Sequence, residues 1–154
     1  MTRQINHSKP RTVPTVYFIG VSTTKSSIMK VYPSWSGILG LGAEIVGYDA
    51  PIHAPAEIYG SIVCHIKEDR LSMGALVTSH KIALLDATRD MFDYLDPYAE
   101  LCGEISCISK RDGRLGGYPK DPIASGLAWE AFVEPVHWER TGRHVMCIGR
   151  VVRL

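Results

Sequence analysis

Two residues suited to proton transfer, a lysine and an aspartate, each stand where a helix is expected to begin. Lys81 ends the segment "ALVTSHK", and Asp121 follows "GGYPK". A lysine beside a carboxylate in a partly dry cleft can exchange a proton with a substrate hydroxyl, because burial and the carboxylate shift its pKa in opposite directions. The helix dipole otherwise disfavours a lysine at a helix N-terminus. We therefore hypothesise that Lys81 and Asp121 form a catalytic pair.

Polar residues gather at three expected junctions between a strand and a helix. They read "STTKSS" at 22–27, "TSHK" at 78–81 and "YPKD" at 118–121. Ligands of open α/β sheets bind outside the carboxyl ends of the strands, and helix N-termini attract anions. A small carboxylate is the predicted ligand. The alternative is that Ser26, Ser79 and Asp121 act only as helix N-caps. His80 is expected to pack or cap rather than to catalyse.

Apolar patterning predicts the elements that must position these residues. Strands are expected at 15–21, 43–49, 75–77, 104–109, 113–118 and 143–149, and helices at 27–39, 55–66, 79–91, 97–103 and 121–132. Asp112-Gly113 favours a hairpin turn. The alternation predicts an α/β fold, a three-layer α/β/α sandwich with a mixed, mostly parallel sheet. Trp35, Trp129 and Phe132 are expected in the core.

Bulk properties exclude several classes of function. The 154 residues and 17.0 kDa suit one well-cored domain, and 45% apolar with 21% charged residues indicates a globular protein. A net charge of +1 without a basic block argues against nucleic-acid binding. No apolar run predicts a membrane span, and the polar start "MTRQINHSKPRT" is not a secretory signal, so a cytoplasmic location is expected. The scattered cysteines predict core thiols and no metal site: Cys64, Cys102, Cys107 and Cys147.

The order of landmarks between about residues 16 and 133 resembles the N-terminal, substrate-binding domain of shikimate dehydrogenases. "FIGVSTTKSS" is similar to the family's serine-bearing loop, which holds the substrate carboxylate, and "ALVTSHK" to its N-V-T-x-P-H-K segment. "GEISC" at 103–107 resembles its G-A-V-N-T segment, and "PKDPIAS" its N-T-D-x-x-G segment. The resemblance implies that Lys81 and Asp121 are the catalytic residues.

Departures from the family pattern concern the polar residues around that pair. Asparagines of the family are replaced by Ala75, Ser106 and Pro119, and a threonine by Lys120. The implied substrate is therefore shikimate, 3-dehydroshikimate or a related small cyclic hydroxy-carboxylate. The substrate-binding residues expected from the resemblance and from the polar junctions are Ser26, Thr24, Thr78, Ser106 and Tyr118.

The resemblance also implies a domain organisation. Residues 1–14 are expected to be a flexible tail, 15–134 the substrate-binding domain, and 135–154 a linker with the first strand of a truncated dinucleotide-binding domain. Full-length relatives use NADP. No NADP is expected to bind this chain alone. The predicted function is the substrate-binding half of an NADP-dependent oxidoreductase, inactive alone, with a cofactor domain in trans or a homodimer as possible partners. The alternatives are a non-catalytic module that binds small carboxylates and a degenerate fragment.

Overall fold

Strands and helices alternate along the chain, as the apolar patterning predicts. The computed structural model describes residues 11–146. The elements in chain order are β1 (Thr15–Gly20), η1 (Thr23–Lys25), α1 (Ile28–Ile38), β2 (Glu44–Asp49), α2 (Ala56–Glu68), β3 (Ser72–Val77), α3 (Lys81–Thr88), η2 (Arg89–Met91), β4 (Tyr94–Leu95), α4 (Pro97–Cys102), β5 (Cys107–Arg111), β6 (Arg114–Tyr118), α5 (Lys120–Glu130) and α6 (His137–Thr141).

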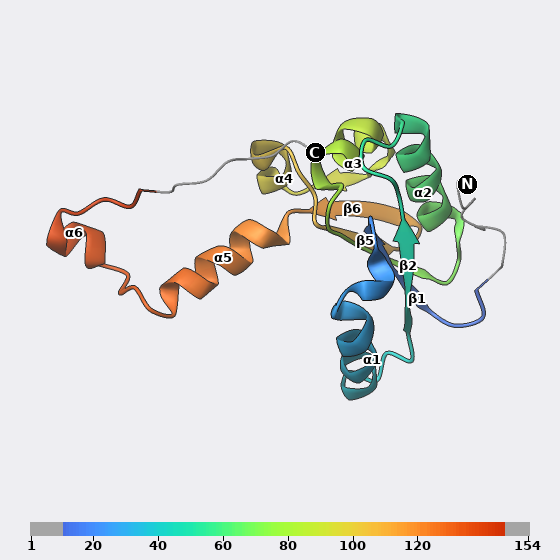
Figure 1. Ribbon diagram of the computed structural model, residues 1–154, viewed down its shortest axis with the longest axis horizontal. Coiled ribbons are helices and arrows are strands. Elements are labelled where there is room, and N and C mark those ends of the chain that lie inside the picture. Colours follow the sequence, from blue (N-terminus) through green and yellow to red (C-terminus); the bar gives the residue numbers. More distant parts are fainter. Residues whose placement is uncertain (1–10, 147–154) are drawn as a thin grey trace.

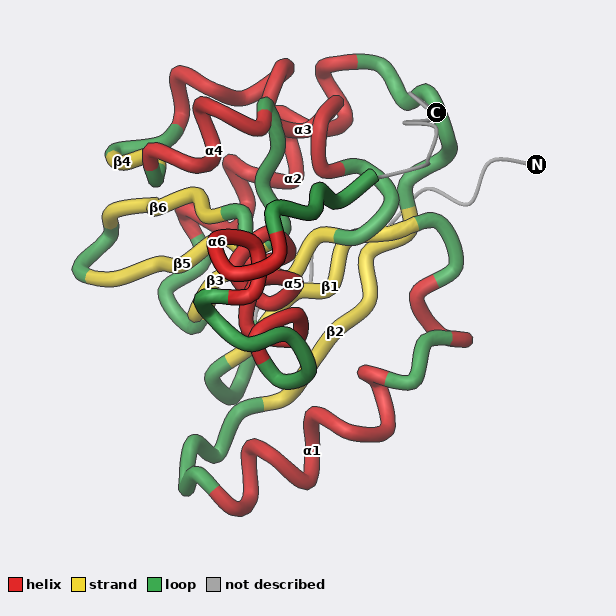
Figure 2. Tube along the Cα trace, turned by 90° about the vertical axis from the view of Figure 1, so that its left-hand side faces the viewer, coloured by secondary structure: helices red, strands yellow, loops and turns green. Residues whose placement is uncertain are grey.

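A six-stranded mixed sheet lies at the centre of the fold, in the order β2-β1-β3-β5-β6-β4. The pairs β1–β2, β1–β3 and β4–β6 are parallel, whereas β5 runs antiparallel to both β3 and β6. Helices α2, α3 and α4 cover one face of the sheet and α1 lies on the other (Figures 1 and 2). The predicted fold class is confirmed.

The main hydrophobic core lies between the sheet and helices α2 and α3. Side chains from β1, α2 and α3 form its centre and are at most 2% exposed: Tyr17, Ile19, Tyr59, Ile62, Val63, Ile66, Leu84 and Leu85. In α2 the core residues recur every three or four positions, and β1 contributes alternate residues, so both periodicities meet at one interface. This core fixes where β3 ends and α3 begins, immediately before Lys81.

A bulge in β3 brings β3 and β5 close together. Thr15 pairs with Ser72 but Val16 pairs with Gly74, so Met73 has no partner on β1. Gly74 has a φ of +127°, and a Cβ placed there would lie 3.1 Å from Ser109 Cα on β5. Only glycine fits this backbone conformation and this contact.

Local signals in the sequence predicted a hairpin turn and a helix start correctly, but not which large aromatic side chains are exposed. Asp112 and Gly113 have φ values of +53° and +75°, as a tight hairpin turn requires, and the Asp96 carboxylate accepts from Tyr98 N at the start of α4. The expectation that large aromatic residues of α1 and the C-terminal region lie in the core was wrong. Trp35, Trp129 and Phe132 are 52%, 39% and 71% exposed.

The C-terminal region differs from the expected strand. Residues 137–141 form α6, and residues 142–146 have no regular structure, while the rest of the expected strand at 143–149 lies outside the described residues. Helices α5 and α6 extend away from the body of the molecule (Figure 1). Within residues 11–146, the helices are too short or too polar to cross a membrane.

A buried tyrosine on β1 takes part in a charged network. The Tyr17 hydroxyl donates to Asp69 Oδ2 at 2.7 Å and lies 2.9 Å from His65 Nε2, and Arg11 Nε donates to it at 3.3 Å. Burial, together with the Asp69 carboxylate, raises the pKa of Tyr17 to about 12, while the Arg11 guanidinium opposes the shift.

We predict that replacing Gly74 destabilises the sheet while replacing a helical glycine does not. Gly74→Ala should lower the free energy of unfolding by roughly 2 kcal/mol or more, because of the positive φ and the contact with β5. Gly60→Ala is the matched control in α2, where a Cβ has nothing within 4 Å, and should raise stability by roughly 0.5–1 kcal/mol. Urea denaturation measures both, and equal effects would contradict the assignment.

We predict that Tyr17 contributes to a loss of stability at alkaline pH. The pKa of Tyr17 in the folded state lies above the ordinary tyrosine value of 10.0. The stabilising contribution of the protonated hydroxyl is therefore complete below pH 10 and is lost as the pH rises toward 12. Between about pH 9 and about pH 11.5, unfolding free energy should fall less in Tyr17→Phe than in the wild type, by on the order of 2 kcal/mol. Parallel curves for the two proteins would refute this contribution.

Candidate active site

The two residues proposed for proton transfer meet in the structure. Lys81 is the first residue of α3 and Asp121 lies in the first turn of α5, and Lys81 Nζ donates a hydrogen bond to Asp121 Oδ2 in an ion pair. The lysine side chain is 23% exposed and the aspartate side chain 52%. The pair therefore lies at the surface of the domain, with the cation more sheltered than the carboxylate, and a substrate can reach it from solvent.

A short segment before β5 holds these two helix starts together. Ile105 N donates to Lys81 O at 3.3 Å, and Lys120 N donates to Ser106 Oγ at 2.7 Å. The backbone of Ser106 is bonded on both sides, because its oxygen accepts from Val77 N and its N–H donates to Tyr118 O. The dipeptide just before β5 thus anchors the first residue of α3 and the first residue of α5.

A pocket of about 280 Å³ lies beside the pair, at the carboxyl ends of β1 and β3. Its lining comes from the serine-bearing loop and from the junction that precedes α3: Phe18, Gly20, Val21, Ser22, Thr23, Ser26, Thr78 and Ser79. Five of these eight residues carry a hydroxyl group. Lys81 lies two residues after Ser79 in the sequence, but it is not one of the described residues that line this pocket.

The serine-bearing loop is fixed by an aspartate at the end of β2. Asp49 Oδ1 accepts from Thr23 N at 2.7 Å and from Thr23 Oγ1 at 2.6 Å, and Thr23 is only 2% exposed. Gly47 makes room for this contact, because a Cβ there would lie 2.8 Å from Thr23 Cβ. Asp49 was not predicted from the sequence. Its position could have indicated this role, because it ends a parallel strand next to the loop that follows the neighbouring strand.

The five predicted substrate-binding residues do not all line one pocket. Ser26 and Thr78 line it, whereas Thr24 is exposed and is not among its described lining residues. Ser106 is 7% exposed and its hydroxyl oxygen accepts from α5, so its visible role is to position Asp121. Tyr118 lies on the α5 side of the site, half-buried at the end of β6.

Lys120 places a second cation near the pair. Its Nζ lies 4.7 Å from the centre of the Tyr118 ring, which packs against Tyr94 at 5.8 Å between ring centres. Burial raises the pKa of the nearby Cys107 thiol, and the positive charge of Lys120 opposes that shift. The α5 side of the site therefore carries the positive charges of Lys81 and Lys120 and the negative charge of the Asp121 carboxylate.

His80 is a structural residue, as expected. It is 4% exposed, its Nε2 lies 3.1 Å from Ala50 O, and its Nδ1 lies 3.0 Å from the Tyr59 hydroxyl. A carbonyl oxygen can only accept, so Nε2 donates, and Nδ1 of the neutral ring accepts from Tyr59. Both ring nitrogens are thereby engaged within the core, and the ring fixes the junction that precedes Lys81.

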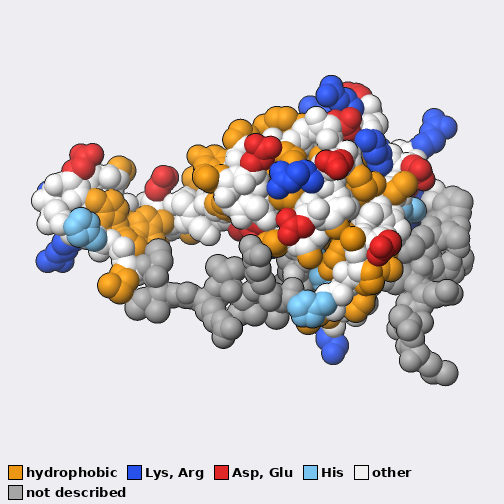
Figure 3. Space-filling model, turned by 90° about the horizontal axis from the view of Figure 1, so that it is seen from above, with side chains coloured by type: hydrophobic (Ala, Val, Ile, Leu, Met, Phe, Trp, Pro, Cys, Tyr) orange, Lys and Arg blue, Asp and Glu red, His pale blue; other side chains and the backbone are white. Residues whose placement is uncertain are grey.

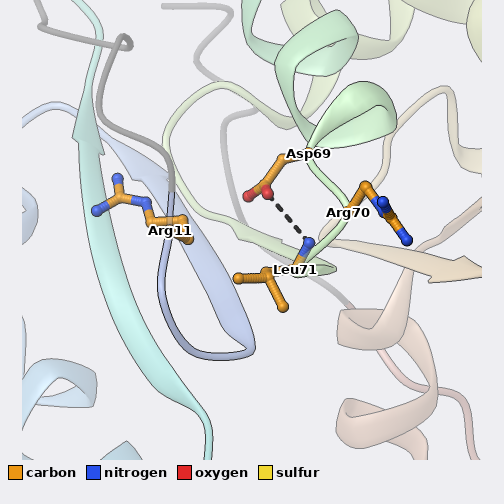
Figure 4. A pocket seen from close by; sticks show the side chains of 4 residues that line it. All are labelled: Arg11, Asp69, Arg70 and Leu71. Carbon is orange, nitrogen blue, oxygen red and sulfur yellow. Dashed lines mark hydrogen bonds between the residues drawn. The ribbon is translucent and has the colours of Figure 1, made fainter.

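A second pocket, of about 510 Å³, lies at the opposite ends of the strands. Arg11, Asp69, Arg70 and Leu71 line it. Figure 4 shows the two arginine side chains pointing away from each other, while Asp69 accepts from Leu71 N at 3.0 Å. Arg11 and Asp69 are both bonded to the Tyr17 hydroxyl, so these two lining residues belong to the buried network around that tyrosine. Among residues 11–146 no cluster of histidine, cysteine, aspartate and glutamate could hold a metal ion.

Comparisons with known proteins agree with the resemblance seen in the motifs. A shikimate dehydrogenase (NADP(+)) of Bacillus cereus (strain B4264) is 29% identical over 110 residues, which cover 69% of this chain and 37% of that protein. The crystal structure of shikimate 5-dehydrogenase from Thermus thermophilus in complex with NADP(H) and shikimate has a TM-score of 0.59 at 20% identity, covering 76% of this chain and 41% of that one. No family model matches the chain.

The same fold occurs in an enzyme with another name. The ligand-free 5-ketofructose reductase of Gluconobacter sp. strain CHM43 has a TM-score of 0.65 at 19% identity, covering 81% of this chain and 42% of that one. This chain spans less than half the length of each of these three proteins. The resemblance to shikimate dehydrogenases is confirmed.

We predict that Asp49 holds the serine-bearing loop in place. Asp49→Ala should lower the free energy of unfolding by about 2–3 kcal/mol, because two hydrogen bonds to a charged acceptor are lost. It should also abolish the protection of the Thr23 amide in hydrogen exchange. Asp86→Ala, at an exposed position of α3, is the control and should leave that amide protected. Unchanged protection in Asp49→Ala would show that the loop does not depend on this carboxylate.

Proposed function

We propose, starting from the resemblance to shikimate dehydrogenases, that this chain is the substrate-binding and proton-transferring part of an oxidoreductase acting on shikimate or a related cyclic hydroxy acid. The observation that carries the proposal is the ion pair between Lys81 and Asp121, which lie forty positions apart in the sequence. The resemblance assigns catalysis to the same two residues, so motif and geometry agree independently.

Lys81 is the proposed proton carrier for the substrate hydroxyl. Its ammonium has three N–H donors, of which one is used by the Asp121 carboxylate, so others remain for a bound hydroxyl or carbonyl oxygen. Asp121 orients the ammonium through the ion pair. In the oxidation direction the neutral amine accepts the hydroxyl proton, and in reduction the ammonium returns a proton to the oxygen. Because α3 and α5 are both tied to Ser106 and its neighbour, the pair is preorganised.

The substrate carboxylate is assigned to the pocket beside the serine-bearing loop. Its hydroxyl lining, with Ser26 and Thr78, supplies donors that suit a carboxylate oxygen. Thr24 lies on the same loop and is exposed, so it is available once a substrate is bound. Tyr118 and Lys120 lie on the α5 side, where Lys120 replaces a threonine of the family pattern, which favours a substrate whose ring hydroxyls differ from those of shikimate.

No glycine-rich turn of the kind that holds a pyrophosphate follows β1, β2 or β3 in the described residues. The junctions that follow β2 and β3, residues 50–55 and 78–80, contain no glycine. After β1, a Cβ on Gly20 would lie 2.8 Å from Thr78 Cγ2, so that glycine packs against a side chain instead of leaving room for a pyrophosphate. We therefore assign NADP, the cofactor in the names of the relatives, to a separate domain supplied in cis or in trans, and assign only proton handling to these residues.

A second candidate function is a module that binds a small carboxylate without chemistry. It is favoured by one observation, that the hydroxyl-lined pocket is described without Lys81 or Asp121 in its lining. Calorimetry on the isolated chain distinguishes the two functions. If Lys81→Ala and Asp121→Asn leave the affinity for shikimate unchanged and no turnover is found with any cofactor domain, the binding module is the better description.

We predict that Lys81 and Asp121 are required for turnover. With NADP, shikimate and the dinucleotide-binding domain of a relative added, Lys81→Ala and Asp121→Asn should each lower kcat/KM by about 10²–10⁴-fold, the usual contribution of a positioned acid or base. The readout is NADPH absorbance over a panel of cyclic hydroxy acids. Lys67→Ala is the matched control, because Lys67 also forms an ion pair, with Asp93 at 3.4 Å. Turnover that survives both site substitutions would remove the roles assigned to the pair.

A further inference from the structure

A pocket at the ends of the strands away from the proton-transfer pair is large enough for a ligand. We use "the Arg11 pocket" for this cavity of about 510 Å³, which is lined by Arg11, Asp69, Arg70 and Leu71. Ligand sites usually measure roughly 300–1,000 Å³. In Figure 4, Arg11 lies on one side of Asp69 and Leu71, and Arg70 lies on the other. The cavity therefore has the size of a ligand site, with a cation on each of these two sides.

Arg11 is held in place by Tyr17, and this contact leaves its outer nitrogens available. Arg11 Nε donates to the Tyr17 hydroxyl at 3.3 Å, and the guanidinium carbon lies 5.5 Å from the centre of the Tyr17 ring. Tyr17 itself is only 2% exposed. The bond uses Nε, so the N–H groups on both Nη atoms can donate to an anion. A side chain that is already fixed loses little conformational entropy when it binds a ligand.

The carboxylate that lines the Arg11 pocket is engaged within the protein. Asp69 Oδ2 accepts from the Tyr17 hydroxyl at 2.7 Å, and Asp69 Oδ1 accepts from Leu71 N at 3.0 Å. The ion pairs described within residues 11–146 involve other side chains than Asp69, Arg11 and Arg70. Asp69 therefore fixes the network around Tyr17, and neither arginine is paired with it.

Positive charge exceeds negative charge around the Arg11 pocket. Lys110 on β5 adds a third cation, because its Nζ donates to Asp69 O at 2.6 Å. Burial lowers the pKa of Lys110, while the Asp69 carboxylate opposes that shift. Three positive charges, from Arg11, Arg70 and Lys110, thus stand against the one negative charge of Asp69. The Glu44 carboxylate, at the start of β2, accepts from a threonine hydroxyl of β1 at 3.3 Å and is not among the described residues that line the cavity.

This surplus of positive charge is local. Figure 3 shows lysine and arginine side chains interspersed with acidic ones over the face of the molecule that is seen from above. The whole chain has a net charge of only +1. A cavity lined by an excess of one sign of charge concentrates ligands of the opposite sign. The Arg11 pocket is therefore expected to attract anions.

We propose that the Arg11 pocket binds a phosphate monoester of a small organic molecule. A phosphate monoester carries about 1.5 to 2 negative charges at pH 7, which matches the surplus, and the planar guanidinium fork binds phosphate through two hydrogen bonds. The two arginines point away from each other (Figure 4), so the phosphate is assigned to Arg11, and the exposed side chain of Arg70 turns toward it on binding. Leu71 contacts the organic part. The proposal does not depend on the proposed function, because the pocket lies at the other ends of the strands.

Calorimetric titration of the full chain at pH 7.5 tests the proposal, with inorganic phosphate and ribose 5-phosphate as probes. We expect each probe to bind at one site per chain, and the affinity to fall as the ionic strength rises. Ribose, and sodium chloride at the same ionic strength, are the matched controls and should give no saturable binding. Absence of saturable binding for both phosphate probes, or equal binding of ribose and ribose 5-phosphate, overturns the proposal.

Arginine variants test where the phosphate binds. Arg11→Gln and Arg70→Gln should each weaken the binding of ribose 5-phosphate about 10-fold or more, because a hydrogen bond to a charged group is lost. Arg11→Gln also removes the bond to Tyr17, so Arg70→Gln, at an exposed position outside that network, separates binding from folding. Arg89→Gln is the matched control, at an exposed position of η2, and should bind as the wild type does. Binding that Lys81→Ala weakens and the arginine changes do not would place the anion at the proton-transfer pair and overturn the proposal.

Discussion

The site depends on the hydrogen bonds made by Ile105 and Ser106 just before β5. One backbone N–H reaches Lys81 O, and one hydroxyl oxygen accepts Lys120 N. These two bonds join the starts of α3 and α5, which the chain separates by forty residues. Ser106 can hold the start of α5 firmly, because its own backbone is bonded to Val77 on one side and to Tyr118 on the other.

Ser106 connects this segment to α5. Its short side chain accepts from the backbone of α5, so its contribution is to the position of Asp121. Under the proposed function, substrate contacts then come from the loop after β1 and from the α5 side with Tyr118 and Lys120. The proposed proton-transfer pair would thus be kept while the residues around it depart from the family pattern, as a shared fold with a different pocket allows.

Burial is distributed very unevenly over the two sides of the sheet. The side that carries α2, α3 and α4 has a continuous core, which accounts for the fixed positions of His80 and Lys81. The side that carries α1 keeps Val31, Trp35, Ile38 and Leu39 at least 38% exposed, and α5 with the segment after it exposes Ile123, Leu127 and Phe132.

The sequence by itself determined the order of β1, α1, β2, α2, β3, α3, α4, β5, β6 and α5, the Asp112-Gly113 turn and the pairing of Lys81 with Asp121. Those features rest on local backbone preferences and on a motif whose residues lie at element ends. Only the tertiary structure decided that Trp35 and Phe132 are exposed, since apolar spacing shows that a helix has an apolar face but not whether a surface exists to cover it. Local sequence patterns also could not predict the two-residue strand β4 or the contact between Asp49 and Thr23. Each of them forms only where segments distant in the sequence meet.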